Sequence, residues 1–195
     1  MFKQLSLGFL VATVLFVAPL ANAYSQAEAK KAWLAIAKLE QANGIPKGLL
    51  HSMSLVETGQ GLEGKVMPWP YTVGVNSPGT VTFASSADAL AKLDVYNQLG
   101  FSKFDVTVNG EVQERLTLYR AERLAARAEG EVKVRPYHYA KRFSDKQEAV
   151  DFVEGALKLG YQNLDVGLMQ INWRYHGQEG EKNCFTSAYC LARFS

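Results

Sequence analysis

Asp165-Val166-Gly167-Leu168-Met169-Gln170-Ile171-Asn172-Trp173 is the most informative stretch of this sequence for both fold and function. It carries no charge after its first residue, and it holds two side-chain amides and a tryptophan. The glycine lets the backbone approach a ligand closely. Amides that leave water need hydrogen-bond partners, and a sugar can supply them. The stretch therefore indicates a site for a neutral, polar ligand.

Two motifs in this order resemble a known enzyme family. Gly167 to Asn172 reads G-L-M-Q-I-N, which resembles the G-L-M-Q-[IVL]-N segment of lytic transglycosylases with a goose-type lysozyme fold. Upstream, Glu57-Thr58-Gly59 resembles the E-S-G triplet that carries the family's catalytic glutamate at a helix end, with threonine keeping the hydroxyl. The resemblance covers about residues 30–75 and 143–176. It implies an α+β, lysozyme-like and mainly helical fold.

The resemblance also implies a set of site residues. Glu57 would be the catalytic acid and base, and a general acid of this kind needs a pKa raised by burial among apolar groups. Leu50 and Met53 are its predicted apolar neighbours, because helical spacing places them beside it. No cofactor and no metal ion are expected. The residues expected to bind the glycan are Thr58, Gly167, Leu168, Met169, Gln170, Asn172, Trp173 and Tyr175.

Other polar and aromatic residues leave alternatives open. Asp165 is either a second catalytic carboxylate, as most glycosidases have, or a turn or capping residue, which is the commoner role of Asp before Gly. Trp69 and Tyr71 are candidates for stacking on sugars or for the core. The three histidines show no metal-binding spacing, and the sequence has no G-x-S-x-G motif, so neither a metal nor a serine hydrolase is indicated.

The first residues have the pattern of a secretory signal. Lys3 precedes the apolar run Leu5 to Leu20, and Ala21-Asn22-Ala23 has the small-x-small form of a cleavage site. An uncleaved membrane anchor is the alternative, because 16 residues approach the length of a span. We expect a signal peptide at 1–23, a periplasmic location without membrane attachment, and one domain at 24–195 with an insertion at about 76–142.

Charge and cysteine content narrow the possible partners. The formal net charge is +2 and the sequence has no basic run, so neither nucleic acid nor an anionic membrane is an expected partner. Cys184 and Cys190 are the only cysteines. An oxidising compartment permits a disulfide between them. A helix does not bring residues i and i+6 together, so the bridge requires a non-helical segment, and unpaired thiols are the alternative.

Periodicity and breakers predict the secondary structure. We expect helices at Ala27–Asn43, Pro46–Glu57, Ser85 or Ser86 to Gly100, Glu114–Glu129 and Asp145–Leu159. Tyr71–Val75 is expected to be a strand, with Thr80–Phe83 returning beside it as a hairpin. Val132–Tyr139 is expected to form a second hairpin. Thr107 to Gly110 is expected to be a turn.

The chain also repeats itself at an offset of 60 residues. Leu99-Gly100 matches Leu159-Gly160, Asp105-Val106 matches Asp165-Val166, and Phe101 matches Tyr161. A duplicated strand–strand–helix unit explains these matches. Chance combined with shared helix-forming patterns is the alternative. Similar topology of residues 71–106 and 131–166 is the expected consequence of duplication.

The resemblance has implications for partners as well. It implies peptidoglycan glycan strands as the substrate and components of a conjugation or secretion system as further partners. The family carries an A-Y-N segment that packs over the catalytic glutamate, whereas here 22 residues follow Trp173 and the nearest string is Ala188-Tyr189-Cys190. A catalytically weak or inactive protein that binds peptidoglycan or docks a secretion complex is therefore the alternative function. A hydrolysing muramidase is a third reading.

Overall fold

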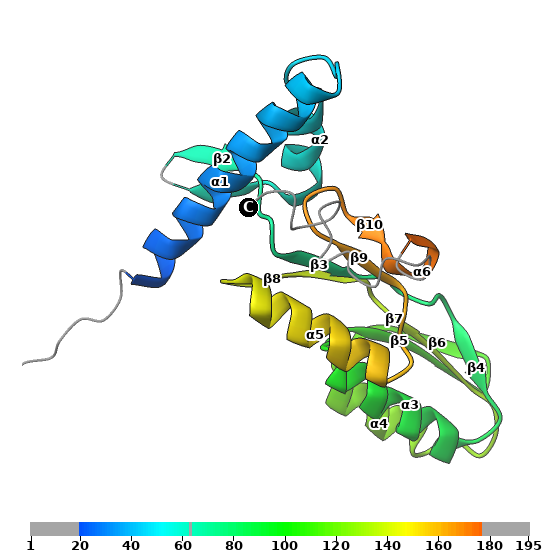
Figure 1. The fold of residues 1–195 in the computed structure, drawn as a ribbon. Coiled ribbons are helices and arrows are strands. Elements are labelled where there is room, and N and C mark those ends of the chain that lie inside the picture. The colour runs from blue at the N-terminus through cyan, green and yellow to red at the C-terminus, as the bar shows by residue number, and fades with distance from the viewer. Residues whose placement is uncertain (1–19, 63, 177–195) are drawn as a thin grey trace, which may run out of the picture.

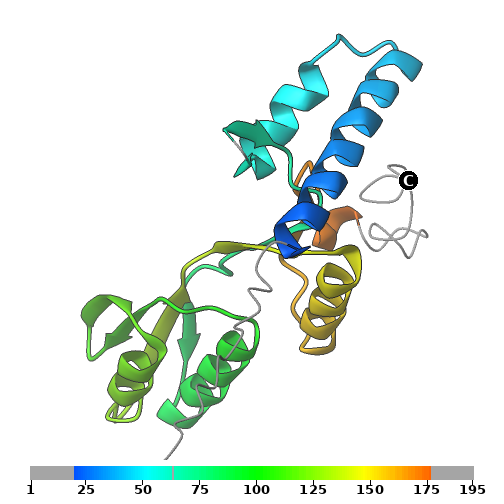
Figure 2. The ribbon, with the colours of Figure 1, turned by 90° about the vertical axis from the view of Figure 1, so that its left-hand side faces the viewer.

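The chain has an α+β fold in which helices cover one side of two antiparallel sheets. The computed structural model describes residues 20–62 and 64–176. Three helices lie together on one side of the sheets, and a helical hairpin stands at the other end of the molecule (Figures 1 and 2). Within the described residues no helix combines the length and apolar character needed to cross a bilayer.

Helical residues outnumber strand residues in the described part of the chain, as predicted. The helices are α1 (Leu20–Ala42), α2 (Leu49–Thr58), α3 (Ser86–Gln98), α4 (Leu118–Ala125), α5 (Lys146–Lys158) and α6 (Trp173–His176). The strands are β1 (Gln60–Leu62), β2 (Lys65–Met67), β3 (Thr72–Val75), β4 (Val81–Phe83), β5 (Phe104–Val108), β6 (Glu111–Leu116), β7 (Val132–Pro136), β8 (Tyr139–Arg142), β9 (Leu164–Val166) and β10 (Ile171–Asn172).

A buried glutamate on α1 fixes the start of α2. Glu40 is 2% exposed and accepts hydrogen bonds from the backbone N–H groups of Gly48 and Leu50, both at 2.8 Å, and of His51 at 3.3 Å. These amides have no partner within the helix, and a carboxylate is a favourable one. Gly48 precedes α2 with a φ of 88°, so the helix begins at Leu49 and not at Pro46 as predicted.

The Glu40 contact makes stability depend on pH. The Gly48 N–H is the largest cause that lowers the pKa of Glu40, and with those of His51 and Leu50 it outweighs burial, which acts to raise it. Because the folded pKa lies below the unfolded value of about 4.3, the contribution is present above that pH and is lost as the pH falls through the folded value. We expect Glu40→Gln to lower the melting temperature by a few degrees at pH 7, and the difference between the two proteins to narrow between pH 7 and pH 3. An equal difference at both pH values would contradict this role.

The pairing of the strands differs from the predicted hairpins. β4 pairs with β7 and not with β3, and β8 pairs with β3 and not with β7. Of the two four-stranded sheets, one has the order β10-β9-β3-β8 and the other the order β4-β7-β5-β6, and β1 and β2 form a separate two-stranded sheet. The chain leaves the first sheet after Val75 and returns at Tyr139, so residues 76–138 build the second sheet between two paired strands. Local sequence does not reveal this pairing, because the partners are far apart in the chain.

The two sheets and their helices are equivalent to one another. α3 and α5 both span 13 residues and begin 60 residues apart, and the side chains of Ser85 and Asp145 cap them by accepting the N–H of Asp88 and Glu148. The order β6-β5-β7-β4 reproduces β10-β9-β3-β8 when each strand is replaced by its counterpart. Each sheet thus takes strands from both copies of the repeat. This shared topology supports duplication over chance similarity.

One hydrophobic core joins the two halves. Val73 and Leu164 of the first sheet and Val106 and Val134 of the second belong to the same buried cluster, together with residues of α3, α4 and α5. The segment predicted as a helix at Glu114–Glu129 forms β6 first and only then α4. The turn at Asn109-Gly110, where φ is 52° and 83°, explains the difference, because it pairs β6 with β5. Tyr119 on α4 is 64% exposed, although the helical spacing of this segment also allows it to face inward.

Candidate functional site

Glu57 lies in the last turn of α2 with its side chain exposed. Of the two apolar residues predicted to bury it, Met53 is itself 48% exposed, and Leu50 packs instead against the cluster of Ala32, Ile36 and Leu168. The buried face of α2 instead carries Ser54 and Thr58, both 0% exposed. Their hydroxyls donate to the carbonyls of His51 and Ser54, so these polar groups are satisfied inside. The prediction of a dry environment for Glu57 in the free chain is therefore wrong.

Thr58 positions the end of the helix and does not face a ligand. Its hydroxyl oxygen accepts the backbone N–H of Trp69 at 3.3 Å, which ties α2 to the segment that leads into β3. Arg142 of β8 reaches the same turn and donates to the carbonyl of Gly59 at 3.4 Å. The threonine of the Glu57-Thr58-Gly59 triplet is thus a structural residue in this chain, which corrects its predicted contact with the glycan.

The helix that carries Glu57 packs on the glycine–glutamine stretch. Leu168 is 1% exposed and forms a small cluster with Ala32 and Ile36 of α1, against which Leu50 of α2 and Met169 pack. Leu168 therefore belongs to the core of this contact. Its predicted place on a ligand surface is wrong. The contact is made by the first turn of α2, and it joins the helix and the stretch in one structural unit, above the open side of the first sheet (Figure 1).

Gln170 is held in one orientation by the backbone around it. Its Nε2 donates to the carbonyl of Gly167 at 2.7 Å and to that of Thr72 at 3.3 Å, and its own φ is 46°. Gly167 is buried with a φ of 75°, and its N–H donates to the Thr72 carbonyl at 2.9 Å. The glycine thus serves the tight turn that presents Gln170, which corrects its predicted role in ligand approach.

Asp165 organises the amides beside this turn. Its two carboxylate oxygens accept hydrogen bonds, both of 2.7 Å, from Nδ2 of Asn76 and Nδ2 of Asn172. Nδ2 of Asn172 also lies 3.3 Å from Oδ1 of Asn163. This geometry supports the structural reading of Asp165. Sequence reasoning missed Asn76 and Asn163, because no motif marks them and Asn76 is 89 residues from Asp165.

The four candidate sugar-stacking aromatics differ in access. Trp69 is 7% exposed and its Nε1 donates to the Phe143 carbonyl, so it is a core residue. The Tyr71 hydroxyl donates to Glu28 at 2.6 Å. Trp173 is partly buried against the main core, whereas Tyr175 is 68% exposed. Among these four, Tyr175 offers the most accessible ring.

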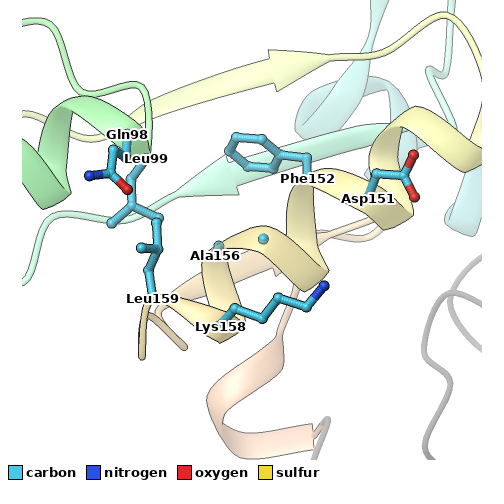
Figure 3. Close-up of a pocket in the computed structure, with 8 residues that line it drawn as sticks. Gln98, Leu99, Asp151, Phe152, Ala156, Lys158 and Leu159 are labelled. Carbon is cyan, nitrogen blue, oxygen red and sulfur yellow. The ribbon is translucent and has the colours of Figure 1, made fainter.

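A pocket of about 360 Å³ lies elsewhere, between the C-terminal end of α3 and one face of α5 (Figure 3). Leu99, Phe152 and Leu159 give it an apolar lining, and it is on the helix side of the sheets. It is therefore a feature of the seam between the two halves and separate from Glu57 and Gln170. Within residues 20–62 and 64–176 no group of three or more His, Cys, Asp or Glu could hold a metal ion. Cys184 and Cys190 lie outside the described residues.

Comparison with known proteins gives no match. No family model, no curated protein and no solved structure matches the chain.

Proposed function

We propose that the chain is a peptidoglycan lytic transglycosylase with a lysozyme-like fold. The observation that carries the proposal is that Leu50 of α2 and Met169 of the glycine–glutamine stretch pack against the same cluster of Ala32, Ile36 and Leu168, so the helix with one family-like motif shares a small core with the other motif. Glu57 lies in the last turn of this helix, and the stretch holds the fixed amides of Gln170 and Asn172. These are the chemical groups that cleavage of a glycan requires: one acid and base, and several fixed hydrogen-bond partners.

Glu57 performs both proton transfers in this mechanism. As the carboxylic acid it gives its proton to the glycosidic oxygen, and the bond from that oxygen to C1 of the muramyl residue breaks. The muramyl 6-hydroxyl oxygen then bonds to C1, and its proton passes to the Glu57 carboxylate. The products are two shorter strands. One ends in a 1,6-anhydromuramyl residue, and the other carries the protonated oxygen as a hydroxyl on its new terminal sugar. No water is consumed.

A bound glycan completes the surroundings of Glu57. Met53 and Val56 form an exposed apolar flank beside the carboxyl group. A sugar ring that lies over this flank excludes water from it, which favours the neutral, proton-donating form of a carboxyl group. The exposed Tyr175 ring is suited to contact a sugar at the other side of the stretch.

The proposed setting is the periplasm, after removal of residues 1–23. The proposed task is local opening of the cell wall for a conjugation or secretion apparatus, whose components are the proposed protein partners. No cofactor takes part in the mechanism.

The soluble products from purified sacculi test the proposal. The purified mature chain is incubated with sacculi, and the released muropeptides are identified by mass spectrometry. We expect 1,6-anhydromuramyl ends. Reducing ends would show a hydrolase that positions water, and an undigested sacculus would contradict both enzymes.

The position of Gln170 gives a second test. A Cβ added at Gly74 would lie 2.8 Å from Oε1 of Gln170, so Gly74→Ala pushes that amide out of place. We expect a stability loss of only about 1 kcal/mol, since a side-chain tip can move, but a fall in cleavage rate of about 10-fold or more. Gly61→Ala is the matched control, because a Cβ there meets nothing within 4 Å. Cleavage by Gly74→Ala at the wild-type rate would show that Gln170 does not position the glycan.

A second candidate function is a peptidoglycan-binding protein with little or no catalysis. The exposure of Glu57 in the free chain favours it, because water surrounds the carboxyl group where the mechanism calls for a water-excluded site. This candidate predicts that the wild-type chain binds sacculi and releases no muropeptides from them.

A further inference from the structure

The second sheet has an open face opposite its helices. Phe104, Val106 and Val134 point into the core beneath α3 and α4. Side chains alternate along a strand, so Asp105 and its cross-strand partner Arg135 point the other way. Helices α3, α4 and α5 lie on one side of the two four-stranded sheets (Figures 1 and 2). The open face of the second sheet therefore continues that of the first.

Two arginines and a tyrosine form a cluster on this face, which we call the Arg–Tyr cluster: Arg115, Arg135 and Tyr137. Both guanidinium groups lie 5.3 Å from the centre of the Tyr137 ring. Asp105 beneath them accepts hydrogen bonds from Nε of Arg135 at 2.9 Å and from the Tyr137 hydroxyl at 2.8 Å. Two guanidinium groups and one carboxylate leave the cluster with a net positive charge.

Arg115 is the member of the cluster whose guanidinium N–H groups are available to bind a ligand. Its backbone N–H donates to Asp105 at 2.9 Å, which holds the residue at a φ of 52°. Bulky residues rarely adopt this conformation, and such positions gather at functional sites. Within the described residues its exposed guanidinium makes no hydrogen bond or ion pair, only the contact with the Tyr137 ring. A flat fork of N–H donors held in this way matches a carboxylate.

The Arg–Tyr cluster is the counterpart of the amides beside Gln170. Asp105 faces Arg135 across the sheet as Asp165 faces Gly74, and Tyr137 follows Arg135 by two positions as Asn76 follows Gly74. The two clusters also adjoin, because β3 and β8 end their ladder at the pair Val75 and Tyr139, next to Asn76 and close to Tyr137. One duplicated scaffold thus carries neutral amides in one copy and cationic groups in the other.

We propose that the Arg–Tyr cluster is a second binding site on this face, which takes carboxylate groups of the stem peptides on the peptidoglycan strand whose sugars lie against the amides. The inference rests on the proposed function for the identity of the polymer. The charge of the cluster complements these carboxylates, and the adjoining amides suit the uncharged sugars.

Binding to two forms of sacculus tests the proposal. The chain carries Glu57→Gln in all samples so that no strand is cut, and its dissociation constant is measured on native sacculi and on sacculi whose carboxylates have been converted to amides. We expect Arg115→Gln to weaken binding to native sacculi by about 10-fold, as for loss of a charge-assisted hydrogen bond. We expect amidation of the sacculi to weaken binding of the chain that keeps Arg115 (the Arg115 chain) to the same level. Amidation should leave binding by Arg115→Gln unchanged.

The control is Arg123→Gln, which removes an exposed arginine that also lies over a tyrosine, Tyr119, but on α4 at the other side of the sheet. Arg123→Gln should bind native sacculi as tightly as the Arg115 chain does. Arg115→Asn provides a second variant, because asparagine tolerates the left-handed backbone, and its melting temperature should not fall.

Three results would overturn the proposal: binding by Arg115→Gln as tight as that of the Arg115 chain, equal losses in Arg115→Gln and Arg123→Gln, or no binding of the Arg115 chain to native sacculi. Failure of the proposed enzyme is seen separately, in sacculi left undigested by the chain with Glu57 intact.

Discussion

Glu57→Gln is expected to abolish release of 1,6-anhydro muropeptides while leaving binding to sacculi unchanged. Glutamine keeps the size of the side chain but neither gives nor takes the proton, and general acid–base catalysis contributes a factor of about 100 to 10,000. The side chain is exposed, so the change in the free energy of unfolding should stay within about 0.5 kcal/mol. The measurement is the rate of muropeptide release, together with the fraction of protein that sediments with sacculi.

Glu154→Gln is the matched control for this prediction. Glu154 is also an exposed glutamate on a helix, α5, but it lies on the helix side of the sheets. It should release muropeptides at the wild-type rate. Retained activity in Glu57→Gln, or equal losses in both variants, would contradict the role of Glu57.

Phe101→Ala is expected to have the largest effect on stability. Phe101 is 2% exposed, and its ring lies 5.5 Å from Tyr96 and Tyr139 and 5.9 Å from Tyr161, between the centres of the rings. Tyr139 and Tyr161 belong to the half built on the first sheet, so Phe101 fills the junction of the two halves. Loss of a buried phenylalanine ring costs about 3–5 kcal/mol.

The positions of the tryptophans allow unfolding of the half without Phe101 to be followed by fluorescence. Trp33, Trp69 and Trp173 all lie outside residues 76–138, so their fluorescence reports the half that does not contain Phe101. Because the halves share one core, urea unfolding followed by fluorescence and by circular dichroism should give coincident curves in Phe101→Ala. Phe101→Leu, which keeps part of the side chain, should cost about 1–2 kcal/mol. An unchanged fluorescence curve would show that the halves unfold independently.

Elements with local signals were predictable from the sequence. Ser85 and Asp145 cap α3 and α5 where helix-start residues were expected. The turn expected at Thr107 to Gly110 forms at Asn109-Gly110, whereas Thr107 and Val108 belong to β5. The strand at Thr72–Val75 also lies within the predicted range. Each of these signals depends on neighbouring residues, and the sequence contains them directly.

Features set by distant contacts were not predictable in the same way. The spacing of Met53 predicted an apolar, buried environment for Glu57, yet Met53 is exposed, because Ser54 and Thr58 satisfy their hydroxyls within the helix and pack inward. The pairing of β4 with β7 joins strands that lie about 50 residues apart. Asn76 meets Asp165 through the same non-local arrangement. The repeat at an offset of 60 residues was the one long-range feature that the sequence displayed.

A crystal structure of Glu57→Gln with a bound muramyl glycan tests the catalytic role of Glu57 most directly. We predict that sugars lie between the end of α2 and Gln170, with a glycosidic oxygen at about 3 Å from the side chain at position 57. A glycan bound away from these two elements, with position 57 still in open solvent, would contradict it.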